Sequence, residues 1–125
     1  MSYYLAIALG GAAGAMCRYW LTTLAEQHNG SMFPVGTFTV NVLGSLAIGL
    51  LFVVLTERIQ VAVYLRPLLM IGFLGALTTF SAFSLDALLL MQEGLFGTAV
   101  TYLVASVVTC LVAAWAGMSI ARLLF

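Results

Sequence analysis

The chain contains no lysine and very little charge of either sign. Its 125 residues include four arginines and four acidic side chains, so the formal net charge is zero. A nucleic-acid-binding surface needs clustered positive side chains, which this composition cannot supply. Histidine occurs once, and cysteine and proline occur twice each. Cys17 and Cys110 lie inside apolar segments, which favours two buried thiols over a disulfide.

Apolar residues make up most of what is present. Hydrophobic side chains account for 64% of the sequence and charged ones for 6%, and the mean hydropathy is +1.18. A soluble domain of this length could not remove so much apolar surface from water, so the surrounding medium must be a lipid bilayer. The length allows one domain, residues 1–125. The composition therefore predicts an all-α integral membrane protein with a single domain.

Four apolar segments can be separated at the charged residues. They extend over about Tyr3 to Ala25, Pro34 to Thr56, Pro67 to Gln92 and Gly97 to Arg122. Each is longer than 20 residues, and at about 1.5 Å per residue such a helix crosses a hydrocarbon layer of roughly 30 Å. We expect four transmembrane helices joined by short connections, with both termini on the same side.

The arginines specify the orientation only weakly. Arg58, Arg66 and Arg122 fall on the side of the termini, and Arg18 falls toward the other side. The positive-inside rule then gives a small bias, so insertion in both orientations is conceivable. A chain that inserts both ways can assemble as an antiparallel homodimer of dual topology.

Small residues recur every fourth position in the first and fourth segments. Gly10 and Gly14 form one such row, and Ala113, Gly117 and Ala121 form the other. Small side chains let helices approach closely in lipid, where apolar burial gives no drive for association. Close helix packing is the expected role of both rows.

Polar side chains also recur every fourth residue, in the second and fourth segments, so each set shares one helix face. The sets are Thr37, Asn41 and Ser45, and Tyr102, Ser106 and Cys110. Asn41 is the most demanding of them, because lipid cannot satisfy its amide. Its side chain could hold two helices together, or it could line a pore in which the two polar stripes face one another.

The centre of the third segment is unlike the rest of a membrane helix. Residues 72–84, GFLGALTTFSAFS, combine two glycines with four hydroxyl side chains. Such sequence predicts a helix broken near Gly75 to Thr79, with free carbonyls ending its first half and free N–H groups starting its second. The carbonyls suit a small cation and the amides suit an anion.

Two pairs of residues follow this predicted break at helical spacing, Phe80 with Phe83 and Ser81 with Ser84. Core packing is the usual role of such phenylalanines. The edge of an aromatic ring, however, carries positive partial charge and can meet an anion weakly. Weak binding is what conduction needs.

Three motifs together resemble a known family. They are residues 10–19, GGAAGAMCRY, residues 41–45, NVLGS, and residues 75–84, GALTTFSAFS. In these motifs, in its length and across all four segments the chain resembles the Fluc (CrcB-type) fluoride channels. The resemblance implies a channel rather than an enzyme, built as an antiparallel, dual-topology homodimer with two pores. It also implies passive fluoride efflux, which lowers fluoride toxicity, across a microbial plasma membrane, the inner membrane in a Gram-negative cell.

The same resemblance assigns site residues. The implied pore side chains are Asn41, Phe80, Phe83, Ser81, Ser84, Tyr102 and Ser106. A structural sodium ion is implied where the two helix breaks meet, held by the backbone carbonyls of Gly75 and Thr78. At position 110 the family often has a hydroxyl side chain, whereas this chain has Cys110. The part of the fourth-segment polar stripe that contains Cys110 is therefore left unassigned. The other implied partners are membrane lipid and a second copy of the chain.

Two charged side chains are expected near a pore mouth. Arg18 lies seven residues before the end of the first segment, and Asp86 lies six before the end of the third. These segments run in the same direction, so the two charges should have similar depth. An isolated charge there is costly, which predicts a shared wet vestibule in which they pair directly or through water. Arg18 would raise the local anion concentration, or it would act as a snorkelling interfacial anchor.

Two other functions were weighed against a channel. A small dual-topology exporter of cationic drugs has the same length and number of spans, but it needs a carboxylate deep in the first span, where none occurs. An intramembrane hydrolase needs a base near Ser81 or Ser84. The single histidine, His28, is in a connection, and Asp86 alone makes a poor dyad. The sequence therefore favours the channel.

Overall fold

The computed structural model of the chain describes residues 2–58 and 63–125. These residues form helices and no strand. The elements, in chain order, are α1 (Tyr3–Gln27), α2 (Val35–Phe52), η1 (Val53–Arg58), η2 (Pro67–Leu74), α3 (Gly75–Leu77), α4 (Phe80–Gln92) and α5 (Phe96–Leu124). The two η elements are π-helical; η1 continues α2, and η2 leads into α3. The expected all-helical secondary structure is confirmed.

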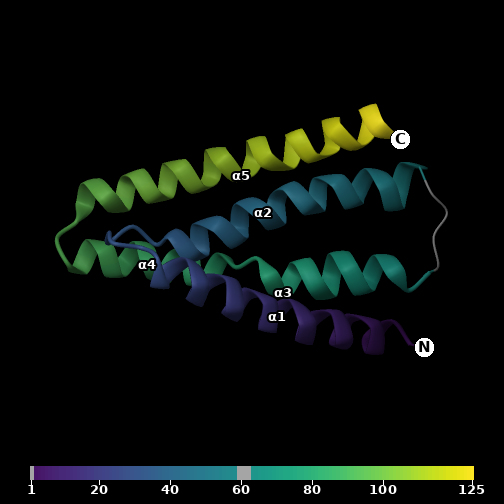
Figure 1. The fold of residues 1–125 in the computed structure, drawn as a ribbon, viewed down its shortest axis with the longest axis horizontal. Helices are drawn as coiled ribbons and strands as arrows, with labels where there is room; N and C mark the ends of the chain where they lie inside the picture. Colours follow the sequence, from purple (N-terminus) through teal and green to yellow (C-terminus); the bar gives the residue numbers. More distant parts are fainter. Residues whose placement is uncertain (1, 59–62) are drawn as a thin grey trace.

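The elements join into four long helical stretches that lie side by side (Figure 1). α5 packs along α2, and α1 packs along η2 and α3. Both ends of the chain lie at one end of the bundle, and the α1–α2 and α4–α5 connections lie at the other. The termini thus lie at the same end of the bundle, and their placement on one side of a membrane stays a prediction.

Among the described residues, three stretches are long and apolar enough to cross a membrane: Val35–Arg58, Pro67–Gln92 and Phe96–Leu124. α1 is 25 residues long but is not one of them. Its many glycines and alanines are only weakly apolar, and it contains Arg18 and Glu26. The composition of α1 therefore makes it the least hydrophobic part of the bundle.

Glycines set the close approach of α1 to η2. A side chain at Gly10 or Gly14 would run into the backbone of Leu68 or Phe73, and one at Gly72 would lie 2.6 Å from the carbonyl oxygen of Ile7. Only a residue without Cβ fits such contacts. The predicted packing role of Gly10 and Gly14 is confirmed.

The α2–α5 pair uses glycine in the same way. A side chain at Gly49 of α2 would collide with the backbone of Ala114, and one at Gly117 of α5 would collide with that of Leu46. Near the chain ends, Arg122 and Glu57 form an exposed ion pair with an N–O distance of 2.8 Å, joining α5 to η1. These contacts hold the two helices at a fixed distance and register.

The core consists of two small clusters on either side of the interruption in the third stretch. One cluster is built on Val40, Leu74 and Leu77. The other contains Phe83, Ala87, Leu90, Ala99 and Tyr102. Most other large apolar side chains are exposed on the outside of the bundle, as in a protein whose solvent is lipid. The interruption therefore lies at the boundary of two packed regions.

Candidate functional site: the helix break and its cavity

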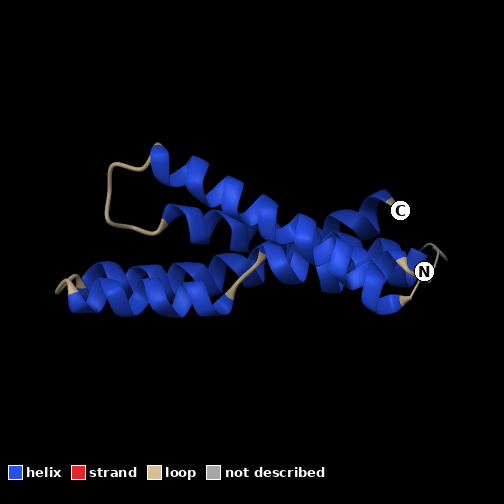
Figure 2. Ribbon diagram, turned by 90° about the horizontal axis from the view of Figure 1, so that it is seen from below, coloured by secondary structure: helices blue, strands red, loops and turns tan. Residues whose placement is uncertain are grey.

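The third helical stretch is interrupted at Thr78 and Thr79, where the backbone is extended (Figure 2). The hydroxyl of Thr78 donates to the carbonyl oxygen of Leu74 at 2.8 Å. Thr79 is the N-cap of α4, because its Oγ1 accepts from the N–H of Ala82 at 3.2 Å. Hydroxyls that bind nearby backbone compete with a continuous helix. The break predicted within residues 72–84 is confirmed and is centred on these two threonines.

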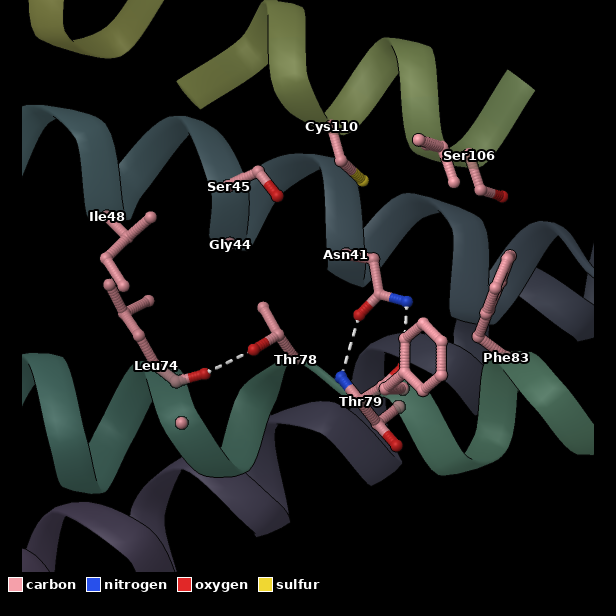
Figure 3. A pocket seen from close by; sticks show the side chains of 13 residues that line it. Asn41, Gly44, Ser45, Ile48, Leu74, Thr78, Thr79, Phe83, Ser106 and Cys110 are labelled. Atoms are coloured by element: carbon pink, nitrogen blue, oxygen red, sulfur yellow. Dashed lines mark hydrogen bonds between the residues drawn. The ribbon is translucent and has the colours of Figure 1, made fainter. Parts of the chain in front are cut away.

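Asn41 of α2 binds both backbone groups of Thr79. Its Oδ1 accepts from the N–H of Thr79 at 2.8 Å, and its Nδ2 donates to the carbonyl oxygen of Thr79 at 3.1 Å (Figure 3). These bonds replace the helical bonds that the break removes. Asn41 therefore holds two helical stretches together, one of the two roles left open by the sequence. It also lines the cavity beside the break, where its second amide hydrogen makes no bond to a described residue.

The break leaves the carbonyl group of Gly75 without its helical partners. The N–H groups that could reach it, those of Thr78 and Thr79, bind Leu74 O at 3.0 Å and Asn41 Oδ1 instead. Gly75 is exposed, and a side chain there would come no closer than 3.8 Å to the backbone oxygen of Met70. The fold of the single chain therefore does not require glycine at this position.

A cavity of about 460 Å³ lies beside the break, between α2, α4 and α5 (Figure 3). Its lining mixes hydroxyl, amide and thiol groups with apolar side chains: Asn41, Gly44, Ser45, Ile48, Leu74, Gly75, Thr78, Thr79, Phe80, Phe83, Ser106, Val107 and Cys110. Asn41 and Ser45 come from the polar stripe of α2, and Ser106 and Cys110 from that of α5. The structure thus brings together two members of each stripe, while Thr37 and Tyr102 lie outside this lining.

The two phenylalanines differ in their surroundings, although both line the cavity. Phe83 is 7% exposed, whereas Phe80 is 78% exposed. Their ring centroids are 5.4 Å apart, and the ring of Phe83 lies 5.2 Å from that of Tyr102. Phe83 is a packed wall of the cavity, and Phe80 stands at its open rim.

Two hydroxyl groups of α5 also have different surroundings. Tyr102 is fully buried and donates to Oδ2 of Asp86 at 3.2 Å. Ser106, one turn further on, is 5% exposed, and its hydroxyl has no hydrogen-bond partner. A buried hydroxyl left unpaired costs about 1–3 kcal/mol. Ser106 lines the cavity, and its hydroxyl oxygen is enclosed by the surrounding protein atoms.

Ser81 and Ser84 do not line this first cavity. The hydroxyl of Ser81 lies 3.2 Å from Oγ1 of Thr79 and lines a second cavity of about 490 Å³. The hydroxyl of Ser84 donates to the carbonyl oxygen of Phe80 at 2.9 Å. Their role in an ion path stays a prediction.

Arg18 and Asp86 line different cavities. Arg18 lines the second cavity, between α1 and α4. Asp86 lines a third cavity of about 350 Å³ together with Glu26 and Glu93. No ion pair joins Arg18 to Asp86 in the part of the chain that the structure describes. The direct pairing suggested by their similar depth is not formed, because Asp86 faces Tyr102 of α5 while Arg18 lies on the α1 side of α4.

Two residues that organise the site were missed by the sequence analysis. Thr79 is bound by Asn41, caps α4 and lines both the first and the second cavity. A hydroxyl residue just before an apolar helical run is the usual N-cap signal, and it could have revealed this role. Phe33, in the α1–α2 connection, packs edge-on against Tyr102 with centroids 5.4 Å apart. No sequence pattern indicates that contact, which depends on how the connection folds over the bundle.

Side-chain metal ligands are not gathered in residues 2–58 and 63–125, where no group of three or more His, Cys, Asp or Glu could hold an ion. A cation at the break would have to be held by backbone oxygens. The freed carbonyl of Gly75 fits that requirement.

Comparison with known proteins places the chain in a family. The family described as CrcB-like protein, Camphor Resistance (CrcB), matches residues 5–118. A protein of Magnetococcus marinus is 47% identical over 118 residues, covering 94% of this chain and 96% of its own. Proteins of Hahella chejuensis (46% identical; 94% and 93% covered) and Stutzerimonas stutzeri (47%; 94% and 95%) are similar to the same extent. All three are named Fluoride-specific ion channel FluC. Because the family match includes the break and both polar stripes, this chain belongs to the CrcB-like family.

Proposed function

We propose that the chain is a fluoride channel in which two antiparallel copies form two pores. Fluoride leaves the cytoplasm passively, down its electrochemical gradient, and the toxicity of the ion falls. The observation that carries this proposal is the cavity beside the break, which is lined by Asn41, by the unpaired hydroxyl residue Ser106 and by two phenylalanines. The names of the relatives support the choice of ion. The site of action is a microbial plasma membrane, or the inner membrane of a Gram-negative cell.

Neutral donors in the cavity would replace the water around the ion. Fluoride is small and strongly hydrated, so it can enter only where several donors meet it. The hydroxyl of Ser106 on α5 and the amide of Asn41 on α2 are two candidate donors in the lining of the cavity. Neither carries a charge, so each can hold the ion and release it, as conduction requires.

The rings of Phe80 and Phe83 would supply selectivity. They are inclined by 47° to one another at a centroid distance of 5.4 Å. Ring edges carry the positive part of the aromatic quadrupole. A small anion can approach these edges and a donor together, whereas a chloride ion is too large for the same narrow contact.

A second copy of the chain would close the pore. The cavity is open at Phe80, and a polar cavity facing lipid tails would leave its hydroxyl and amide groups unsatisfied. The open space in front of Gly75 would let the partner's break approach closely. An antiparallel two-fold arrangement would then produce two equivalent cavities, with α1 as the fourth span of each copy.

A sodium ion between the two breaks would be held by the backbone carbonyl groups of Gly75 and Thr78 from each copy. The fit rests on Gly75, whose carbonyl has lost its helical partners and whose missing side chain leaves room. A hard monovalent cation prefers such oxygen ligands. When bound it would supply one positive charge that joins the two breaks.

The test is fluoride efflux from liposomes that contain the purified protein. With a potassium ionophore present, fluoride should leave down its gradient at a rate proportional to the amount of protein, as read by a fluoride electrode. Matched liposomes loaded with chloride should show no efflux above protein-free controls. Equal rates for the two halides would contradict selectivity, and absence of fluoride efflux from protein-containing vesicles would contradict the channel itself.

A further inference from the structure

The α1–α2 connection is folded so that the backbone of Phe33 is held in place. The side-chain amide of Asn29 donates to the carbonyl oxygen of Phe33 at 2.7 Å, and the N–H of Val35 donates to the same oxygen at 2.8 Å. The amide oxygen of Asn29 accepts from the N–H of Ser31 at 3.1 Å and from its hydroxyl at 2.9 Å. These bonds within one short segment fix the place from which the ring of Phe33 extends.

Glu26, in the last turn of α1, ties this connection to the start of α2. One carboxylate oxygen accepts from the N–H of Gly36 at 2.8 Å, and the other accepts from the amide of Asn29 at 3.2 Å. A carboxylate at a helix N-terminus satisfies N–H groups that have no partner within the helix. Gly36 is buried, and a Cβ there would lie 3.0 Å from the carbonyl oxygen of Thr22 of α1. The two helix ends that flank Phe33 are therefore held together.

The ring of Phe33 lies against Tyr102 of α5. Their centroids are 5.4 Å apart and their planes are inclined by 88°, the edge-to-face geometry that aromatic pairs prefer. Tyr102 is fully buried, and its hydroxyl donates to Oδ2 of Asp86. The ring of Tyr102 also lies 5.2 Å from that of Phe83, which is the packed wall of the cavity. A row of three rings therefore leads from the connection to the cavity beside the break.

We propose that Phe33 is a positioning residue for the wall of this cavity, an inference that rests on the proposed channel function. The ring of Tyr102 is held by Phe33 and Phe83, and its hydroxyl is held by Asp86. Loss of the Phe33 ring frees Tyr102 to turn, and Phe83 then loses a firmly packed neighbour. The edge of Phe83 no longer keeps a fixed distance from the donors of the cavity. Fluoride flux should fall, although Phe33 does not line the cavity itself.

Phe96 provides a matched control at the same end of the bundle. It begins α5, next to the α4–α5 connection, and its side chain is 63% exposed. Within residues 2–58 and 63–125 its ring is paired with no other aromatic ring. The change from phenylalanine to leucine removes one ring at either position and keeps an apolar side chain. A difference between the two leucine variants therefore reports the ring contacts of Phe33.

The first test follows Tyr102 directly. The purified protein is labelled with 3-fluorotyrosine, and its fluorine NMR spectrum is recorded in detergent. The signal of Tyr102 is the one that the Tyr102→Phe variant lacks. In Phe33→Leu this signal should shift and broaden, because the ring leaves its single packed environment, whereas Phe96→Leu should leave it at the parent position. An unchanged Tyr102 signal in Phe33→Leu would overturn the positioning role.

The second test is fluoride efflux from liposomes. Phe33→Leu should reduce the rate by about fivefold, the order expected for the loss of one aromatic pair. Phe33→Tyr keeps the ring and should conduct at nearly the parent rate, and Phe96→Leu should do the same. Parent-like efflux from Phe33→Leu, or equal losses in the two leucine variants, would contradict the proposal.

A double variant separates positioning from a general loss of stability. In Phe83→Ile the ring that Phe33 supports through Tyr102 is already absent, so adding Phe33→Leu should reduce efflux by less than about twofold further. A further loss of about fivefold in this background would show that Phe33 does not act through the wall, and the proposal would fail. If the parent passes no fluoride while the Tyr102 signal still depends on Phe33, the positioning of Tyr102 stands and the proposed channel function fails.

Discussion

At the scale of single residues, Asn41 has two tasks that depend on one another. Its amide binds the backbone of Thr79, which holds the break open, and the same side chain lines the cavity beside the break. Asparagine suits both tasks, because its side chain presents an acceptor and two donors in one plane. A structural and a conducting role are therefore compatible in this side chain.

Replacing Asn41 with alanine should destabilise the chain and abolish fluoride flux. Both backbone groups of Thr79 lose their partner, which should lower the free energy of unfolding by about 1–3 kcal/mol. Ser45→Ala is the matched control, since Ser45 lines the same cavity one turn along α2 but makes no bond to Thr79. Unfolding in mixed detergent would measure the stability of both variants, and efflux from liposomes would measure their fluoride flux. Parent-like stability of the alanine variant would show that the break does not need this contact.

Isoleucine at Phe80 or Phe83 should cut fluoride flux by roughly tenfold while the dimer stays assembled, because the ring edge is lost and the apolar bulk is kept. The two variants should differ in stability. Phe83 is packed against Tyr102, so Phe83→Ile should lower the free energy of unfolding by about 1 kcal/mol, whereas exposed Phe80 should tolerate the change. Efflux and unfolding measured on the same preparations would separate these effects. If both isoleucine variants conducted fluoride at nearly the parent rate, the phenylalanines would have a packing role and no role in conduction.

At the scale of elements, the third helical stretch is two helices held end to end by side chains from elsewhere. Thr79 starts α4, Thr78 closes α3, and Asn41 ties the gap to α2. The two glycines in this stretch have different structural roles. Gly72 permits the close contact with α1, while Gly75 is exposed and a Cβ there would make only an ordinary contact within the chain.

Leucine at these two glycines should therefore give different defects. Gly75→Leu should keep the fold of the chain and weaken the dimer, since a Cβ at this position meets nothing in the chain closer than 3.8 Å. Gly72→Leu should damage the chain itself, because its Cβ would lie 2.6 Å from the backbone oxygen of Ile7. Light scattering in detergent would report the dimer, and circular dichroism on heating would report the chain. A stable Gly75→Leu dimer would show that the break does not lie in the proposed dimer interface.

At the scale of the whole molecule, the weak charge bias is the feature with the widest consequence. Both chain ends lie at one end of the bundle and the α1–α2 and α4–α5 connections at the other (Figure 1). Neither end carries the excess of positive residues that would impose one orientation. The proposed antiparallel dimer needs both orientations in one membrane.

Added lysines should therefore control assembly. Leu124→Lys with Phe125→Lys biases the end that carries the termini. Gly30→Lys with Gly97→Lys biases the opposite end, where a Cβ at either glycine meets nothing within 4 Å. Each variant alone should insert one way and lose fluoride flux, and co-expression of the two should restore it. Cysteine accessibility from either side would report orientation. Full flux from a variant with a single orientation would rule out the antiparallel dimer.

The sequence by itself determined the solvent, the helical class, the place of the break and the two polar stripes, because these follow from composition and from spacing along one chain. The resemblance in three motifs determined the family. Only the tertiary structure decided which groups meet: Asn41 with Thr79, Asp86 with Tyr102, and Arg18 with neither. These contacts depend on the rotation of each helix about its axis, which packing against the other helices sets. For the same reason Phe80 and Phe83, three residues apart, are respectively exposed and buried.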